Sequence, residues 1–373
     1  MEATTAHSET LRALAPADHE ALAGLARATF PFTQVRFVVP SEAGGVVATV
    51  EGRLVAASLL RIVRCPGGRR IGFIAWLMTD PAHRGRGLAL RLIEASGALL
   101  RARGCDVVAA DVEGYNTGSA NLFHRAGYRR LTLWQQARLW GPVDAVWMWL
   151  RTGFAIDPGF FLWVAGAGTS PPRPWRARLV VLLSNTLLAL LAWSLGGGLL
   201  LAGEAAWPSA STAAAFLLAV GSLLAAREAA MRAVARRHGT PLEFRAWPGG
   251  WALSLLIAAG FGRTFPLPGN LYPPGDGWHT RDHRTVLGQG AVVAALLLAG
   301  LVVLGSVVRG AAEVAFLAQV AQALLFVGKP LLVFDTLLAV APFEGFNARH
   351  LKAYDRRAWW LLSLLAIVLF AWA

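Results

Sequence analysis

Charged side chains, lysine and cysteine are all scarce in this chain of 373 residues. Charged residues make up 15% of the sequence and hydrophobic residues 55%, whereas about 25% of an average globular protein is charged. Of the 35 basic residues, only Lys329 and Lys352 are lysines. Because so little charge is available to cover a protein surface, a single soluble domain is not expected. The composition favours a chain that is partly embedded in a membrane.

The two cysteines and the first residues exclude further classes of protein. Cys65 and Cys105 are too few for a disulfide framework or a cysteine zinc site, so we expect a reducing compartment. Residues 1–5 contain no basic segment followed by an apolar run, so we predict no cleavable signal peptide. The net charge of +13 comes mostly from arginines beside apolar runs, which is typical of topology-setting charges in membrane proteins. We therefore expect no nucleic acid partner.

The charge is unevenly distributed and divides the chain into a head and a tail. Residues 1–150 contain 17 arginines and 12 acidic residues, whereas the 223 residues that follow contain only 18 basic and 10 acidic ones. Hydrophobic patterns in the head alternate between strands and helices, which indicates an α/β or α+β domain over residues 1–140. They predict helices over 8–30, 87–103 and 117–126, and strands over 46–50, 54–64, 71–78, 107–112 and 129–139.

Residues 141–177, which follow the head, are rich in tryptophan and phenylalanine. Trp147, Trp163 and Trp175 are among them, and tryptophan is favoured at the depth of lipid headgroups. We interpret this segment as an aromatic interfacial linker that lies on the bilayer. A hydrophobic linker packed on the head is the alternative.

Residues 178–373 are predicted to form an all-α membrane domain. A span needs roughly 20 apolar residues, and five long runs qualify: 179–203, 205–226, 285–308, 314–343 and 358–373. The apolar stretch 246–262 is short and is interrupted by Pro248, so we expect it to enter the membrane without crossing it. The sequence therefore predicts about five spans.

Arginine-rich clusters predict how these spans are oriented. The clusters at 173–178, 227–237 and 349–357 all face the cytoplasm if 246–262 does not cross, in agreement with the positive-inside rule. We therefore expect a multi-pass protein of the cell inner membrane, with the head in the cytoplasm and the C-terminus outside.

A glycine-rich turn in the head is suited to a pyrophosphate. After the strand 71–78, Arg84-Gly85-Arg86-Gly87-Leu88-Ala89 leads into a helix. Glycines let the backbone approach an anion closely, and the N–H groups at the start of a helix point at its oxygens. Arg84 and Arg86 add positive charge. By itself this turn is a weak signal.

A second motif makes the signal specific. The strand 107–112 is followed by Asn116, Ser119, Leu122, Phe123, Gly127 and Tyr128. Over residues 8–140, the two motifs resemble the GNAT superfamily of acyl-CoA N-acyltransferases, whose patterns are V-x-P-x-x-R-G-x-G-x-A and N-x-x-A-x-x-L-Y-x-x-x-G-F. The resemblance implies a mixed twisted sheet with helices, and direct attack of an amine on the thioester of acetyl-CoA.

The resemblance also implies where acetyl-CoA binds. A splayed pair of strands would admit it, and the residues beside the thioester would be Ala75, Trp76, Leu77 and Met78. The pyrophosphate would lie on Arg84, Gly85, Arg86, Gly87, Leu88 and Ala89. Asn116 would contact the pantetheine arm or fix the neighbouring loop, and Phe123 belongs to the same binding motif.

The catalytic residues depart from the family pattern. Phe123 takes the place of the tyrosine that usually acts as general acid, and it has no hydroxyl. Tyr115 or water would then protonate the thiolate, or the thiolate would leave without an acid. Glu113 is the first candidate for general base, followed by Asp80 and Asp111. The alternative for each carboxylate is a structural role.

In the tail, Arg227, Glu228 and Met231 lie close together, Glu243-Phe244-Arg245-Ala246-Trp247-Pro248 follows, and Glu344 lies far downstream. With these stretches, the region of about residues 210–357 resembles the site-2 proteases, which are intramembrane zinc metalloproteases with an H-E-x-x-H helix. Glu228 takes the place of their general base, but the ligand positions hold Arg227, Met231 and Glu344. Because arginine cannot ligate a cation and a thioether is a poor zinc ligand, we expect no metal and a proteolytically inactive tail.

Charges in the tail leave alternatives open. Glu228 is either an acid in a polar cavity or the ion-pair partner of Arg227 or Arg232. Asp335 lies in an apolar run and needs a partner or a water-filled cavity. A cavity lined by Asp335, Glu228 and Glu344 is a further hypothesis.

These observations lead to two functional hypotheses. The first is a membrane-anchored N-acetyltransferase that transfers an acetyl group from acetyl-CoA to an amine acceptor at the cytoplasmic membrane face. The second is a non-catalytic acyl-CoA-sensing head coupled to a pseudoprotease that binds a membrane protein or peptide. Both have acetyl-CoA and the lipid bilayer as partners.

Overall fold

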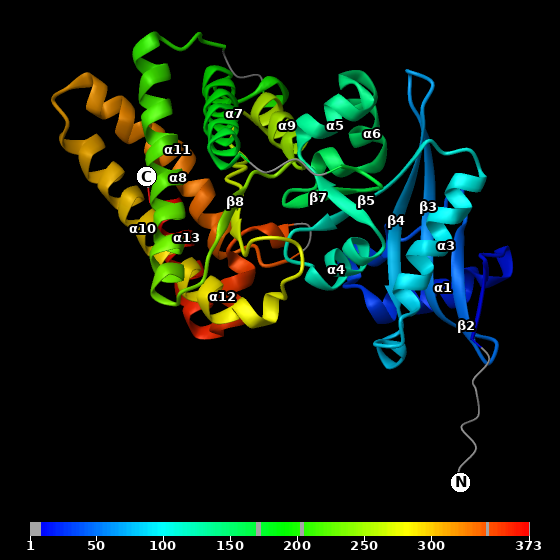
Figure 1. Ribbon diagram of the computed structural model, residues 1–373. Helices are drawn as coiled ribbons and strands as arrows, with labels where there is room; N and C mark the ends of the chain where they lie inside the picture. Colours follow the sequence, from blue (N-terminus) through cyan, green and yellow to red (C-terminus); the bar gives the residue numbers. More distant parts are fainter. Residues whose placement is uncertain (1–8, 169–172, 202–204, 341–342, 373) are drawn as a thin grey trace. The chain divides into compact units, whose positions relative to one another are not determined.

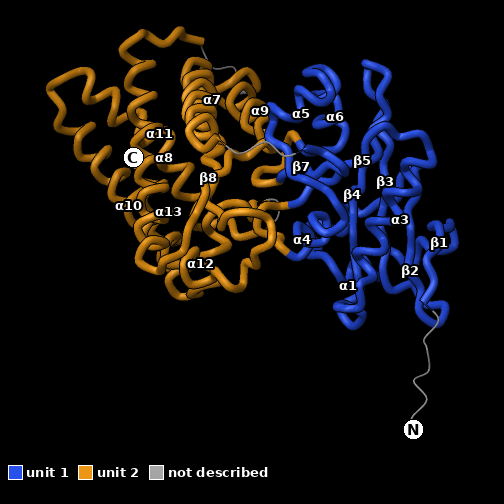
Figure 2. Tube along the Cα trace, in the orientation of Figure 1, with its two compact units in different colours: residues 1–112, 118–154, 161–170 blue, residues 113–117, 155–160, 171–373 orange. Residues whose placement is uncertain are grey.

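The computed structural model describes residues 9–168, 173–201, 205–340 and 343–372, which fall into two compact units (Figure 2). Unit 1 holds the described residues of Met1–Val112, Gly118–Phe154 and Phe161–Ser170. Unit 2 holds those of Glu113–Thr117, Ala155–Phe160 and Pro171–Ala373. The residues on which the signal-peptide prediction rests lie outside the described part of the chain.

Unit 1 is built around a seven-stranded sheet in the order β1-β2-β3-β4-β5-β7-β6 (Figure 1). The strands are β1 (Glu9–Ala13), β2 (Gly45–Val50), β3 (Arg53–Arg64), β4 (Arg70–Thr79), β5 (Val107–Glu113), β6 (Tyr128–Leu131) and β7 (Phe160–Ala165). The helices are α1 (His19–Thr29), α2 (Phe32–Val35), α3 (Leu88–Ala102), α4 (Thr117–Arg125), α5 (Leu133–Trp140) and α6 (Pro142–Thr152). Because β4 and β5 are parallel and β3 and β4 antiparallel, the sheet is mixed. The predicted fold class of the head is confirmed.

The core of unit 1 lies on both faces of this sheet. Successive residues of a strand point to opposite faces, and β2 follows this rule. Val47 packs with Leu22 of α1, whereas Val46 packs with Leu88 of α3. The burial of Leu88 holds the first turn of α3 on the sheet, directly after the glycine-rich turn.

The hairpin between β2 and β3 forms where the sequence predicts it. Glu51 and Gly52 at its tip have φ angles of 51° and 78°, as a two-residue turn with two positive φ angles requires. Gly52 adopts this conformation without strain.

Two other predicted elements are only partly correct. The helix expected over 8–30 begins at His19, because Glu9–Ala13 instead pairs with the edge of β2. The strand expected over 129–139 ends at Leu131, because the side chain of Thr132 accepts a hydrogen bond from the Gln135 N–H and begins α5.

The structure also differs from the aromatic linker expected over 141–177. Residues 142–152 form α6, and β7 enters the sheet between β5 and β6. Trp163 is 3% exposed on this strand. An apolar run rich in aromatic residues is compatible with a buried strand as well as with a membrane interface. Here residues 160–165 pair with β6 and therefore form a strand of the sheet. On α6, Val143, Trp147 and Leu150 remain exposed.

Unit 2 is helical apart from the two-stranded sheet of β8 (Glu243–Arg245) and β9 (Asn270–Tyr272). Its helices are α7 (Pro174–Ser194), α8 (Ala210–Arg237), α9 (Trp251–Phe261), α10 (Arg284–Ala311), α11 (Ala315–Thr336), α12 (Ala348–Tyr354) and α13 (Arg356–Ala371). Small side chains line the contacts among α8, α10 and α11. Ala219, Ala291 and Ala323 are fully buried there, as is common where membrane helices pack closely.

Four helices in the described part of the chain are long and apolar enough to cross a membrane: Pro174–Ser194, Ala210–Arg237, Thr280–Ala311 and Ala315–Thr336. They coincide with the first four predicted spans. The fifth predicted span forms α13, which has 16 residues. At about 24 Å it is shorter than the roughly 30 Å apolar core of a bilayer. The 11-residue α9 is too short to cross, in agreement with the expectation for 246–262.

Candidate active site

The parallel strands β4 and β5 stay in register over only part of their length. Ile71 lies opposite Val107, and the register ends with Ile74 opposite Ala110. β4 then continues to Thr79 alongside β3. Backbone groups that leave a ladder need other partners, so this divergence exposes β4 backbone to a ligand.

The four residues predicted to lie beside the thioester occupy this diverging part of β4. A bulge leaves Ala75 without a register partner on β3. Trp76 and Leu77 are half-buried, like Ala75, and Met78 is 1% exposed. Bulges beside active sites redirect backbone groups. The bulge at Ala75 therefore interrupts the β3–β4 register at the place where the thioester is predicted to lie.

Gly85 and Gly87 shape the turn between β4 and α3. Their φ angles are 80° and 77°, a left-handed conformation in which any side chain is strained. A Cβ atom at either glycine would meet nothing within 4 Å. The backbone conformation therefore requires these glycines, and the space above them is open.

The first turn of α3 offers N–H groups and positive charge to an anion. α3 has 15 residues and begins after Gly87, and the first N–H groups of a helix have no helical partner. Arg84 and Arg86 are exposed beside it, Leu88 is buried and Ala89 is half-buried. Residues 84–87 thus form an exposed turn, and Leu88 and Ala89 form the start of α3, which Leu88 anchors to the sheet.

Phe123 lies in the hydrophobic core of unit 1. It is 3% exposed, and its ring contacts that of Tyr128 edge to face at 5.1 Å between centroids. Burial raises the pKa of Tyr128 to about 12, so this phenol stays neutral at physiological pH. The role of Phe123 in cofactor binding remains a prediction.

Glu113 and Tyr115, the predicted catalytic residues, are buried within unit 2. Glu113 is 4% exposed, and its carboxylate accepts hydrogen bonds from Arg349 Nη1 at 2.6 Å and from the Tyr115 N–H at 3.0 Å. Burial raises the pKa of Glu113, and the charge of Arg349 opposes that shift. The hydroxyl of Tyr115 donates to the Leu271 carbonyl at 2.9 Å. Their catalytic roles remain predictions, but both side chains have structural partners.

The other candidate residues lie in more open positions. Asn116 is exposed, and its N–H donates to the Glu113 carbonyl at 3.0 Å. The Asp80 carboxylate accepts from the Ala82 N–H at 2.8 Å and so begins a short 3₁₀ turn. Asp111 is half-buried on β5.

Sequence reasoning missed Arg349 as the partner of Glu113. The two residues are 236 positions apart, so no local pattern joins them. The sequence predicts only that Arg349 belongs to a cytoplasmic cluster of basic residues.

In the tail, Arg227 and Asp335 form a buried ion pair. Arg227 Nε and Nη2 donate to the two oxygens of Asp335 at 2.5 and 3.0 Å. The two side chains are 4% and 1% exposed. Asn347 Nδ2 donates to the same carboxylate at 3.0 Å, and Arg227 Nη1 donates to the Gly269 carbonyl at 3.0 Å. Asp335 thus has the partner that its place in an apolar helix demands.

The three carboxylates expected to share a cavity lie in separate ion pairs. Glu228 pairs with Arg178 and with Arg232, one of its two predicted partners, at 2.7 and 2.6 Å. Glu344 lies 4.0 Å from Arg349. The described residues contain no group of three or more potential metal ligands, which does not test the expected absence of a metal.

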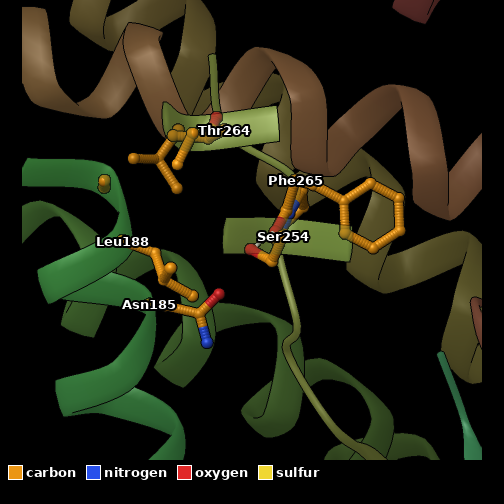
Figure 3. A pocket seen from close by; sticks show the side chains of 9 residues that line it. Asn185, Leu188, Ser254, Thr264 and Phe265 are labelled. Atoms are coloured by element: carbon orange, nitrogen blue, oxygen red, sulfur yellow. Dashed lines mark hydrogen bonds between the residues drawn. The ribbon is translucent and has the colours of Figure 1, made fainter. Parts of the chain in front are cut away.

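A small pocket in unit 2 lies between α7, α9 and α11 (Figure 3). Its polar side chains are all bonded to backbone. Asn185 Nδ2 donates to the Leu267 carbonyl at 2.9 Å, Ser254 to Phe265 at 2.6 Å and Thr264 to Phe326 at 3.2 Å. These bonds stabilise the irregular chain after α9.

Comparison with known proteins supports a GNAT domain in the head. Residues 12–128 match the model of the acetyltransferase (GNAT) family. A similar solved structure is the ribosomal-protein-S18-alanine N-acetyltransferase from Escherichia coli, at 16% identity over 44% of this chain and 100% of that chain, with a TM-score of 0.32. Another is N-acetylglutamate synthase from Neisseria gonorrhoeae with coenzyme A and N-acetyl-glutamate. Its sequence identity is 16%, the match covers 42% of this chain and 35% of that chain, and the TM-score is 0.32. A search of curated proteins found no match.

Proposed function

We propose that this protein is a membrane-anchored N-acetyltransferase, which transfers an acetyl group from acetyl-CoA to an amine acceptor at the cytoplasmic face of the cell inner membrane. Residues 12–128 form a GNAT acetyltransferase domain, and four candidate membrane spans follow it. The observation that carries the proposal is the combination of diverging strands and a left-handed glycine turn in that domain.

In the proposed reaction, the amine nitrogen attacks the carbonyl carbon of the acetyl group. A C–N bond forms, the C–S bond breaks, and the CoA thiolate takes up the proton that the amine loses. The turn of residues 84–89 binds the pyrophosphate. The N–H of Ala75, which has no register partner on β3, is suited to polarise the carbonyl oxygen.

The proton transfers are assigned as predictions. We propose Glu113 as the base, through a water, and Tyr115 or water as the acid. Both side chains already have partners in unit 2, so neither faces the reaction freely. A general base works only when it is deprotonated, so its pKa sets the fall in rate at low pH. A Glu113→Gln variant that loses this acidic limb of the pH–rate profile would support the base, and an unchanged profile would contradict it.

Anchoring to the bilayer is supported by the tail and by α6. Beyond the four candidate spans, Val143, Trp147 and Leu150 expose an apolar face on α6. Arg151 stacks over Trp147 at 5.8 Å, and an aromatic ring beside a cation suits the headgroup region. We propose that this face contacts lipid headgroups.

We further propose that the tail is a zinc-free relative of site-2 proteases and does not cleave peptides. Arg227 stands at the first ligand position of that resemblance, and its guanidinium is bound to Asp335. A fixed positive charge there opposes binding of a dication.

The proposal is tested by incubating membrane extract with isotopically labelled acetyl-CoA, with and without the purified protein. Mass spectrometry should detect labelled amides that depend on the protein, and calorimetry should detect acetyl-CoA binding. Binding without any labelled product would favour the alternative of an acyl-CoA-sensing head coupled to a pseudoprotease. The observation that favours this alternative is the burial of Glu113 and Tyr115, the two proposed catalytic side chains. Absence of binding would contradict both.

A further inference from the structure

The segment Glu113–Thr117 begins at the last residue of β5, yet it packs within unit 2 (Figure 2). β5 is one of the two strands whose divergence defines the candidate site. The segment also carries Asn116, which the family resemblance places near the pantetheine arm. Its conformation therefore bears on acetyl-CoA binding, and residues far along the chain fix that conformation.

The first anchor is the ion pair between Glu113 and Arg349. Arg349 Nη1 donates to Glu113 Oε2 at 2.6 Å, and the side chains are 30% and 4% exposed. The second oxygen of Glu113 accepts from the Tyr115 N–H at 3.0 Å. The carboxylate thus links α12, which carries Arg349, to the turn after β5. Removing Arg349 would leave a buried carboxylate without its cation, which strongly favours rearrangement of the turn.

The second anchor is the side chain of Tyr115. It is 1% exposed. Its ring stacks on Tyr272 at 4.5 Å and meets His350 edge to face at 4.2 Å. Its hydroxyl donates to the Leu271 carbonyl at 2.9 Å.

Backbone contacts complete the attachment. The Thr280 hydroxyl donates to the Tyr115 carbonyl at 2.6 Å, and the Thr280 N–H donates to Thr117 Oγ1 at 3.2 Å. The Gly114 N–H donates to the Gly159 carbonyl at 3.0 Å. Both side chains and backbone groups of this segment therefore bond to other residues of unit 2.

We propose that Arg349 is a positioning residue for acetyl transfer, which acts through Glu113 to hold the segment 113–117 in the conformation that binds acetyl-CoA productively. The inference rests on the proposed function. It makes the membrane tail a working part of the acetyltransferase and not only its anchor. It also predicts that the isolated head has low activity.

The test uses the full chain in lipid nanodiscs with three variants: Arg349→Met, Arg349→Lys and Arg232→Met. Arg232 is a matched control, because it also pairs with a glutamate at 2.6 Å and its side chain is 32% exposed. Acetyl-CoA turnover is read as free-thiol release over a panel of amines. Hydrogen exchange reports the amides of 114–117.

We expect Arg349→Met to lower kcat about tenfold or more, since small misplacements near a reacting group cost that much. The KM for acetyl-CoA should change less, and exchange at 114–117 should rise. Arg349→Lys, which keeps the charge, should recover most of the turnover. Arg232→Met should behave as wild type in all three measurements. If Arg349→Met does not fold, Glu113→Gln with Arg349→Met removes the unpaired charge and serves for the exchange measurement alone, because Glu113 is itself the proposed base. Equal exchange at 114–117 in this double variant and in wild type would then overturn the anchor.

Faster exchange with unchanged kcat and KM would overturn the positioning role, as would equal losses in Arg349→Met and Arg232→Met. A wild-type protein that binds no acetyl-CoA would instead contradict the proposed function. In that case slower exchange at 114–117 in wild type than in Arg349→Met would still establish the anchor, and equal exchange would overturn it.

Discussion

At the scale of single residues, the glycine-rich turn depends on conformations that only glycine adopts cheaply. Gly85 and Gly87 both have positive φ angles, and a Cβ atom placed at either one would meet nothing within 4 Å. The same combination occurs at Gly68, which has a φ of 83° in the turn before β4. A substitution at Gly68 is therefore a control, because it introduces similar backbone strain outside the predicted binding surface.

We expect Gly87→Glu to weaken acetyl-CoA binding severely, because both a side chain and a negative charge would meet the pyrophosphate. Arg84→Ala should cost roughly 1–3 kcal/mol of binding free energy, as for one charge-assisted contact. Calorimetry measures both. Gly68→Glu carries similar strain at the other end of β4 and should bind normally. Wild-type affinity in Gly87→Glu would refute the assignment of the turn.

The burial of His350 leads us to predict that the stability of the folded protein depends on pH. Burial lowers its pKa to about 3, and the charges of Arg349 and Arg227 act in the same direction. In the unfolded chain its pKa is about 6.5. Between these two pKa values, His350 is protonated in the unfolded state and neutral in the folded state. The folded state therefore loses stability as the pH falls from about 6.5 toward 3. His350→Gln should flatten the change in unfolding midpoint between pH 7.5 and 5, whereas His238→Gln, at an exposed position, should leave it as in wild type.

At the scale of elements, α8 carries the residues on which the proposed proteolytic inactivity of the tail depends. Arg227 and Met231 lie one helical turn apart, where two histidines would bind zinc. The pair of Arg227 with Asp335 joins α8 to α11. An active zinc site would need this pair to be broken and both ligands to be restored.

We predict that purified protein contains no stoichiometric zinc by elemental analysis. Arg227→His with Met231→His should raise zinc binding, because it restores two imidazoles on one face of a helix. Arg227→Met alone should not bind zinc, and it should lower stability by about 3–5 kcal/mol because Asp335 stays buried without its partner. One equivalent of tightly held zinc in wild type, with chelator-sensitive cleavage of a membrane substrate, would contradict the inactive tail.

At the scale of the whole molecule, the four candidate spans agree with the distribution of arginine. Two spans separate the cluster at 173–178 from the one at 227–237, and two more separate that cluster from 349–357. If all four candidate spans cross a membrane, the three clusters lie on one side of it. The short α9 does not change this parity.

Reporter fusions test this topology. Fusions after Gly239 and Tyr354 should give cytoplasmic signals, and a fusion at Glu313, between α10 and α11, should give an external one. A fusion after Trp372 should be external if the 16-residue α13 crosses, as the five-span expectation requires. An external signal at Gly239 would reverse the whole orientation.

The candidate site was predictable from the sequence where its chemistry is local. Residues 84–89 form one continuous turn, and the positions of Gly85 and Gly87 in the motif fix their conformation. The diverging residues 75–78 follow from the family resemblance, and their bulge could not be read from their composition. Arg349, which pairs with Glu113, and the Leu271 carbonyl, which accepts from Tyr115, lie more than 150 positions away from them along the chain. No spacing rule reaches so far.

The sequence by itself determined the elements whose cause is local or solvent-driven. Turn residues fixed the hairpin of β2 and β3, glycine fixed the turn before α3, and apolar length fixed the four candidate spans. Only the tertiary structure decided that β7 belongs to the sheet, that Arg227 pairs with Asp335 and that Arg349 holds Glu113. A strand needs a neighbour and a buried charge needs a counter-charge, and the chain supplies both from distant positions.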